Sequence, residues 1–251
     1  MSTTRSFAHI ACLAILGSLT LLDHFAIAQV VADSVAQFSG TQSLNGWSYG
    51  YYDGDTPGAY TPADFELLPL FDGIQWLIED TSFQSGPPPH GYWTRLTATG
   101  GHPNGNLTTT ALSANHWAVR RWTSSQSATY MISGLLKDDN AAPISSFEYN
   151  GVIGHIFVDG AEVLTLPINE GGIVNYSINV SLNTGSNVDF AIDAKKSALN
   201  PNRTIDWTDA TTFTAQISLP EPASASIAGA AVLALSVGRL RSRVRRMQRI
   251  A

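Results

Sequence analysis

The segment Ile173–Leu182, with the sequence IVNYSINVSL, alternates apolar and polar side chains along almost its whole length. Successive side chains of a β-strand point to opposite sides, so this pattern gives a strand one apolar and one polar face. A helix cannot use the pattern, because the apolar face of a helix repeats every three or four residues. We therefore expect a half-buried β-strand here.

The neighbouring segments carry similar signals. Asp159-Gly160 lies between two apolar-rich runs within 151–168, and this dipeptide favours a β-hairpin because the tight turn requires positive φ angles. Further strands are expected at 187–194 and 211–219. The region 116–138 indicates either two strands or one long bent strand.

Closely spaced strands with little helical periodicity between them predict an all-β fold, an antiparallel β-sandwich of jelly-roll-like type, over residues 29–218. About 190 residues can bury enough surface to hold such a domain without disulfides. A short helical turn is expected at Ala63–Leu68, because Pro62 suits the first position of a helix and Pro69 ends it.

The N-terminus has the layout of a secretory signal peptide over residues 1–28. Arg5 supplies a positive start, an apolar run follows at Ile10–Leu22, and the small side chains of Ala26 and Ala28 form a cleavage site. We expect an N-terminal signal helix that is cleaved by signal peptidase after export. A buried N-terminal helix is the alternative.

Charge is divided unevenly along the chain. Between Gln29 and Ser218, 7 Lys and Arg stand against 18 Asp and Glu, a net charge of −11, whereas six arginines lie in the last 13 residues. An acidic domain repels phosphate backbones, so we expect no nucleic-acid partner.

The C-terminal stretch 219–251 differs from the domain before it. Pro220-Glu221-Pro222 precedes an uncharged run of small residues, which indicates a transmembrane helix at about 223–240. The arginine-rich end is expected to stay cytoplasmic, with the acidic domain outside. A solvated basic helix behind an Ala-rich linker is the alternative. The basic anchor residues are Arg239, Arg241, Arg243, Arg245 and Arg246.

This order of Pro-Glu-Pro, apolar helix and arginine-rich end resembles the PEP-CTERM sorting signal of exported bacterial proteins. The resemblance implies that an exosortase, a membrane transpeptidase-like enzyme, cleaves at or near residues 220–222. It also implies delivery to the cell envelope or extracellular matrix of a bacterium that makes exopolysaccharide. It assigns no activity to the domain in front.

A second resemblance covers pieces of the domain, which look like β-sandwich modules that stand in front of such signals and resemble carbohydrate-binding jelly rolls. This resemblance implies a sandwich fold and glycan binding. The pieces are NGWSYGYYDGD at 45–55, His102-Pro103, AVRRWTS at 118–124 and DWTDATTF at 206–213.

The aromatic run within 45–55 is the first candidate site. On a strand, Trp47, Tyr49 and Tyr51 share one face, and Tyr52 points to the other. Such a row can stack on sugar rings while its hydroxyls form hydrogen bonds. Packing of the same aromatics in the sandwich core is the alternative.

The pair Arg120-Arg121 is the second candidate. Alternation sends the two arginines to opposite faces, so the inward one needs a carboxylate partner. The outward one can hydrogen-bond sugar hydroxyls beside Trp117 or Trp122. We take Arg120, Trp117 and Trp122, together with Asp206, as candidate ligand-binding residues, and structural ion pairing as the alternative.

No cofactor is predicted, although oxygen-rich loops can hold calcium. Turn capping is the favoured role of Asp206 and Asp209, and calcium binding, together with Asp53 and Asp55 if the fold brings them close, is the alternative. No other metal is expected, because the histidines lack zinc-site spacing and the only cysteine, Cys12, lies in the predicted signal peptide.

No catalytic residue is predicted. The sequence contains no G-x-S-x-G elbow, phosphate loop or H-E-x-x-H motif. We therefore expect a non-enzymatic, exported protein that binds carbohydrate such as exopolysaccharide. A purely structural matrix protein without a specific ligand is the alternative, and a glycan-active hydrolase is less favoured.

Overall fold

In a computed structural model of the chain, all of the described strands lie between Gln29 and Pro220. Apart from Ala28, the predicted signal peptide lies outside the described residues, as does everything after Pro220, including Glu221, Pro222 and the arginines. The structure describes residues 28–55, 59–79, 91–106, 112–140, 151–196, 204, 206 and 209–220.

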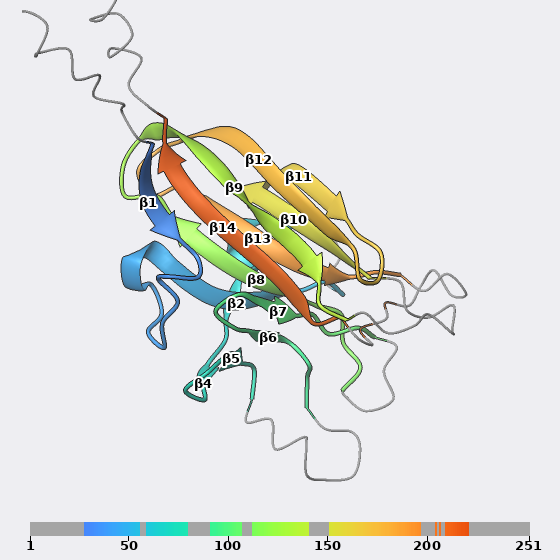
Figure 1. The fold of residues 1–251 in the computed structure, drawn as a ribbon. Helices are drawn as coiled ribbons and strands as arrows, with labels where there is room; N and C mark the ends of the chain where they lie inside the picture. Colours follow the sequence, from blue (N-terminus) through green and yellow to red (C-terminus); the bar gives the residue numbers. More distant parts are fainter. Residues whose placement is uncertain are drawn as a thin grey trace, which may run out of the picture. The chain divides into compact units, whose positions relative to one another are not determined.

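The strands form two antiparallel sheets (Figure 1). Sheet A runs, in spatial order, through β12 (Ile173–Leu182), β9 (Ala128–Asp138), β14 (Thr211–Leu219), β7 (Gly100–His102), β6 (Arg95–Leu96), β5 (Trp76–Leu77) and β4 (Leu70–Phe71), with β1 (Gln29–Asp33) also on β14. Sheet B runs through β11 (Ala161–Pro167), β10 (Val152–Val158), β13 (Asn187–Ala194), β8 (His116–Thr123), β2 (Trp47–Asp53) and β3 (Glu66–Leu67).

One apolar core joins the two sheets. Phe213 of β14 meets Phe190 of β13 edge to face at 5.9 Å, and Tyr130 of β9 meets Trp122 of β8 at 5.5 Å. These buried rings come from facing sheets, so the all-β antiparallel sandwich predicted from the sequence is confirmed.

The strongest local predictions are confirmed. β10 and β11 form the expected hairpin, and both Asp159 (φ 50°) and Gly160 (φ 85°) adopt the positive φ angles that its turn requires. β12 has the predicted bounds, and it pairs with β9 without a register shift. The region 116–138 is two strands, and they lie in different sheets.

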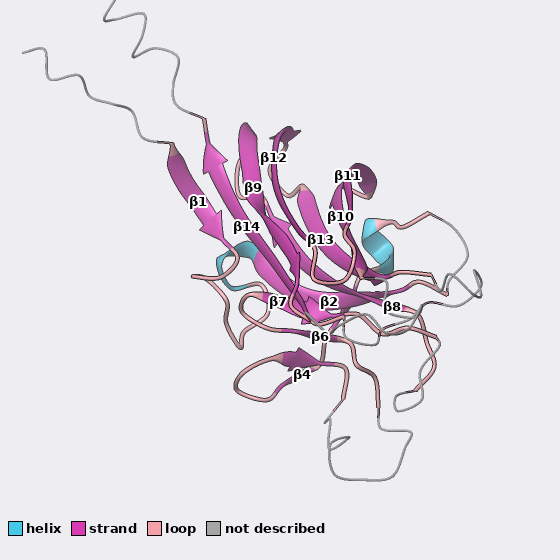
Figure 2. Cartoon of the chain, turned by 45° about the vertical axis from the view of Figure 1, so that its right-hand side comes forward, coloured by secondary structure: helices cyan, strands magenta, loops and turns pink. Residues whose placement is uncertain are grey.

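The segment Ala63–Leu68 differs from the expected helical turn. Only Pro62–Asp64 (η2) is helical, as a single 3-10 turn, whose N-cap Thr61 exchanges hydrogen bonds with Asp64. Residues 66–67 instead extend sheet B as β3, because the backbone there pairs with β2. A second 3-10 turn, Leu44–Gly46 (η1), leads into β2, and strands make up most of the rest (Figure 2).

β1 and β14, the first and last strands of the unit, lie side by side, with Gln29 opposite Leu219 (Figure 2). Among the described residues, no helix has the length and apolar character needed to cross a membrane.

Candidate functional site

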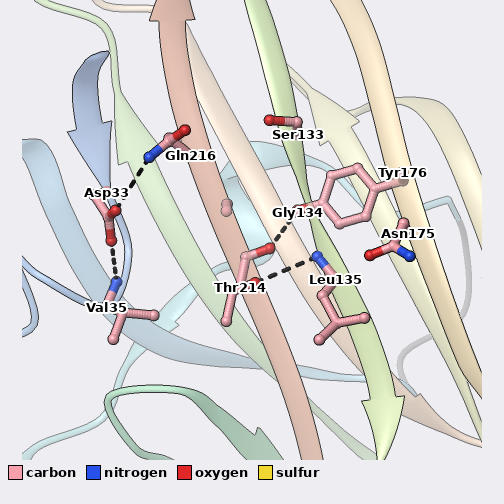
Figure 3. A pocket seen from close by; sticks show the side chains of 10 residues that line it. Asp33, Val35, Ser133, Gly134, Leu135, Asn175, Tyr176, Thr214 and Gln216 are labelled. Carbon is pink, nitrogen blue, oxygen red and sulfur yellow. Dashed lines mark hydrogen bonds between the residues drawn. The ribbon is translucent and has the colours of Figure 1, made fainter.

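A groove of about 550 Å³ lies on the face of sheet A that is turned away from the core. The end of β1 and the turn behind it contribute Asp33 and Val35 to one side of the groove, and β12 contributes Asn175 on the other (Figure 3). Thr214 and Ser133, from the two strands in between, lie on its floor. The remaining residues of the groove are Gly134, Leu135, Tyr176, Ala215 and Gln216.

Strand alternation explains why this surface is polar. Inward residues of β9 and β14, such as Ile132 and Ile217, are fully buried in the core. Their neighbours therefore point outward, and in this region they are mostly short hydroxyl and amide side chains. Gln216 and Asn175 are both exposed.

Hydrogen bonds hold the framework of the groove. On the core side of the sheet, beneath the groove, the Tyr176 hydroxyl donates to the Thr214 carbonyl at 2.7 Å. It passes Gly134, where a Cβ atom would lie only 2.6 Å from that hydroxyl. The Thr214 Oγ1 accepts from the Leu135 amide at 3.3 Å. Asp33 Oδ1 accepts from the amide of Val35 at 2.9 Å, which fixes the turn after β1. The backbone around the groove is therefore held in place before any ligand binds.

The side chains of Ser133 and Asn175 take no part in this hydrogen-bonded framework. Neither forms a hydrogen bond with any other part of the chain that the structure describes. Gln216 makes one long contact, from Nε2 to Asp33 Oδ2 at 3.5 Å. The groove therefore offers hydroxyl, amide and carboxylate groups that can exchange hydrogen bonds with a polar ligand.

The predicted aromatic platform is corrected by the structure. Trp47 and Tyr49 do share a face of β2, and Tyr52 points to the other, but the shared face is turned into the core and both side chains are 0% exposed. The Trp47 Nε1 donates to Gln37 Oε1 at 2.9 Å. Neither ring is accessible to a sugar, so the core alternative holds for these two residues.

The other candidate aromatic side chains also make contacts within the domain. Tyr51 is half-buried, and its hydroxyl donates to Glu66 Oε2 at 2.5 Å. Trp122 is 4% exposed inside the sandwich. Trp117 lies on the outer face of sheet B, where it stacks on His155 with ring centroids 4.8 Å apart and an angle of 4°. The predicted residues therefore do not form one row, since Trp122 lies in the core and Trp117 lies on the outer face of sheet B.

The inward arginine, Arg120, is 2% exposed and has no carboxylate partner among the described residues. Its guanidinium donates instead to the carbonyls of Thr97 (2.6 Å), Ala98 (3.2 Å) and Phe213 (3.3 Å). Burial lowers its pKa to about 10. Arg120 therefore links the backbone of the loop at Thr97 and Ala98 to the core. Its prediction as a ligand contact is wrong.

The outward arginine, Arg121, forms the ion pair. Its Nε donates to Asp189 Oδ1 at 2.7 Å, and its guanidinium lies 4.0 Å from the centre of the Phe65 ring. Tyr60 donates to the same carboxylate at 2.7 Å. Tyr60 and Phe65 thereby cover an aromatic cluster on the outer face of sheet B, which leaves Tyr52 only 4% exposed.

Asp206 is 1% exposed, so it is not a surface contact for a ligand. Its Oδ2 accepts from the Gly105 amide at 3.0 Å, whereas Asp55 accepts from the Asn115 amide and Asp53 from the Asp55 amide. These bonds match the turn and loop role that was favoured over calcium.

Buried carboxylates gather where β9 ends and β14 begins. Neither oxygen of Asp209, which is 0% exposed, accepts a hydrogen bond from a described residue. Burial, followed by the charges of Asp206, Asp138 and Glu170, raises the pKa of Asp209 well above its usual range. Burial likewise raises the pKa of Asp138 and of Asp206 to about 6.

These shifts predict that the carboxyl cluster contributes less to stability as the pH rises. Because the folded-state pKa values exceed the ordinary value of about 4, folding favours the protonated carboxyls, and this contribution disappears between about pH 4 and 6 and above. Burial lowers the pKa of His102 to about 3, which acts in the opposite direction, so the cluster shows in the difference between variant and wild type. We expect Asp209→Asn to raise the melting temperature more at pH 7.5 than at pH 5. Asp139→Asn, next to this cluster but exposed, is the control, and an equal effect of both changes would contradict the assignment.

Within the described ranges, no group of three or more His, Cys, Asp or Glu side chains is arranged to hold a metal ion. Calcium at Asp206 and Asp209 stays the alternative. It would show as a rise in melting temperature with added calcium chloride that Asp209→Asn abolishes.

The residues that line the groove were not among the sites predicted from the sequence. The alternation of β12 does place Asn175 on a polar face, but a polar face is normally solvated surface. Only the antiparallel pairing of β12, β9 and β14, with β1 beyond, brings Asn175, Ser133, Thr214 and Asp33 into one depression.

The fold defines an antiparallel two-sheet sandwich, a class that includes proteins of many functions. No protein-family model matches the sequence, and no curated protein matches it. Among solved structures, it is similar to a family 35 carbohydrate binding module from Clostridium thermocellum, with 13% identity over 42% of this chain and 72% of that one and a TM-score of 0.28. Rabbit GITRL is 15% identical, covers 42% of this chain and 75% of its own, and has a TM-score of 0.27.

A third similar structure is a β-glucosidase from Kluyveromyces marxianus, with 11% identity over 84% of this chain and 20% of that one and a TM-score of 0.33. All three TM-scores are low, so these likenesses identify neither a family nor a ligand for this chain.

Proposed function

We propose that the domain binds carbohydrate without catalysis, through the groove on the outer face of sheet A. The observation that carries the proposal is the gathering of Asp33, Ser133, Asn175, Thr214 and Gln216 around about 550 Å³ of open space. Sugars present many hydroxyls that both donate and accept, and short hydroxyl, amide and carboxylate side chains on a rigid sheet suit them.

Charge and rigidity also favour this kind of ligand. The domain is strongly acidic, which favours neutral glycans over polyanions. Four adjacent strands carry the groove, so binding would cost little ordering of the protein. An extended polysaccharide such as exopolysaccharide fits an open groove on a sheet better than a closed cavity.

Two asparagines of β12 provide a matched test. Asn175 and Asn179 are both exposed on the same side of the strand, but only Asn175 borders the groove. We expect Asn175→Ala to weaken polysaccharide binding about fivefold, which corresponds to one lost hydrogen bond of about 1 kcal/mol, and Asn179→Ala to leave it unchanged. A glycan array followed by calorimetry measures both. Equal losses in both variants would contradict the groove.

The two alternative functions predict different experimental results. A structural matrix protein without a specific ligand would show no glycan binding although the domain melts cooperatively. A glycan-active hydrolase would release reducing ends from a bound polysaccharide, which a reducing-sugar assay detects. We favour binding over hydrolysis because Asp33 is the only carboxylate in the described lining of the groove, and glycosidases generally use a pair.

We further infer that residues 1–28 are a signal peptide and 219–251 a PEP-CTERM sorting segment, as their sequences suggest. The domain would then be exported, held briefly by the helix at about 223–240, and released by an exosortase to the envelope or matrix. Replacement of Pro220-Glu221-Pro222 by three alanines should leave an uncleaved, membrane-held form in a host with the sorting enzyme. Unchanged processing, followed by mass spectrometry, would remove this part of the proposal.

A further inference from the structure

The edges of the two sheets differ in how they are protected from pairing with another strand. An open edge exposes unpaired amides and carbonyls, and proteins normally block it with charges, proline, a bulge or a very short strand. In the described part of the chain, β11 carries Glu162 and Pro167 and has a register shift against β10. β1 has a register shift and ends at Asp33. β3 and β4 are two residues long.

β12 has none of these features. It is ten residues long, contains no charged residue and no proline, and pairs with β9 in unbroken register; β9 is the only described strand it pairs with. Its apolar side is incompletely covered, since Val174, Ile178 and Val180 are only half-buried although they point toward the core. Ile173 at its start is 62% exposed.

The sequence of β12 is complementary to itself in the antiparallel direction. Opposite residues of two antiparallel strands lie on the same side of the sheet, so a workable register must pair inward with inward residues. With Ile178 placed opposite its own copy, Tyr176 faces Val180 and Val174 faces Leu182 on the inner side. On the outer side, Ser177 faces Asn179 and Asn175 faces Ser181.

In this register apolar side chains meet apolar ones, and hydroxyls meet amides that can hydrogen-bond to them. A shift by one residue would set each apolar side chain against a polar one. The other described edge of comparable length, β11, would bring Glu162 and Pro167 into such a pairing.

We propose that two copies of this chain associate through β12, in an antiparallel arrangement centred on Ile178. Sheet A then continues across both copies, and the two copies of Val174, Ile178 and Val180 complete the burial that one copy leaves open. The acidic domains repel each other, so association should strengthen as salt screens that repulsion.

A pair of charge variants in the full chain tests the register. Ser177→Lys with Asn179→Lys places lysine opposite lysine twice in the dimer, and we expect the dissociation constant to rise about tenfold or more in sedimentation experiments. Ser177→Lys with Asn179→Glu places lysine opposite glutamate, and should restore association. Ile74→Lys is the control, because Ile74 is 77% exposed in the turn between β4 and β5, at the other end of sheet A.

Cross-linking supplies a second measurement. In a chain with Cys12→Ser, Ile178→Cys should form a disulfide dimer on mild oxidation, because paired Cα atoms lie within disulfide range. Ile173→Cys, outside the overlap of the two strands, should cross-link far less. A wild-type chain that stays monomeric at all concentrations and salt levels would overturn the proposal, as would a dimer that both charge variants leave unchanged. Unaltered melting of the variants excludes misfolding as the cause.

Discussion

Trp47→Ala is expected to lower the free energy of unfolding by about 3–5 kcal/mol, because it empties the space of a large, fully buried ring. The change also removes the donor to Gln37, which lies in the turn after β1. Since small domains are stable by about 5–15 kcal/mol, this single change can unfold a substantial fraction of the protein. Urea unfolding followed by circular dichroism measures it.

The same substitution separates the core interpretation from the sugar platform. Trp47→Phe, which keeps most of the apolar volume, should recover much of the lost stability and is the fallback if the alanine variant is insoluble. Neither change should alter glycan affinity in molecules that remain folded. A Trp47→Ala variant as stable as the wild type but unable to bind polysaccharide would show that the ring serves a ligand.

Asp189→Ala is expected to cost about 3–5 kcal/mol, because it leaves the Arg121 guanidinium partly buried without its counter-charge. Asp189 is 0% exposed and accepts from Arg121 and from the Tyr60 hydroxyl. The variant therefore removes the anchor that fastens the segment around Tyr60 to sheet B. Chemical unfolding gives the stability, and proteolysis near Tyr60 should speed up.

The exposed pair Lys137–Asp139, at 2.8 Å, is the matched control. Lys137→Ala should change stability by less than about 1 kcal/mol, because solvent already screens an exposed pair. Asp189→Asn keeps the shape without the charge, and we expect it to fall between the two. Equal effects of Asp189→Ala and Lys137→Ala would contradict the burial argument.

The fold was predictable where local chemistry decides it. Asp159-Gly160 specifies its turn through positive φ angles, and the alternation of Ile173–Leu182 specifies a strand with one buried face. The segment Ala63–Leu68 was less predictable, since pairing with β2 draws residues 66–67 into sheet B after a single 3-10 turn.

The candidate site was predicted less well, for a definable reason. The two-residue period of a β-strand predicts that Trp47 and Tyr49 share a face and that Arg120 and Arg121 do not. Both predictions hold in the structure. The period cannot tell which face meets the other sheet. Trp47, Tyr49 and Arg120 lie on the inner face of sheet B, whereas Trp117 lies on its outer face. The groove is built from serine, threonine and amide side chains that looked like ordinary solvated surface.

The sequence by itself therefore determined that this chain forms antiparallel strands, where its tightest hairpin lies, and that its domain is acidic. These properties depend on neighbouring residues and on composition. Only the tertiary structure decided which side chains are core, that Arg121 rather than Arg120 forms the ion pair, and that Asp33, Ser133, Asn175 and Thr214 border one groove. These outcomes depend on strand order and sheet stacking, which join residues far apart in the chain.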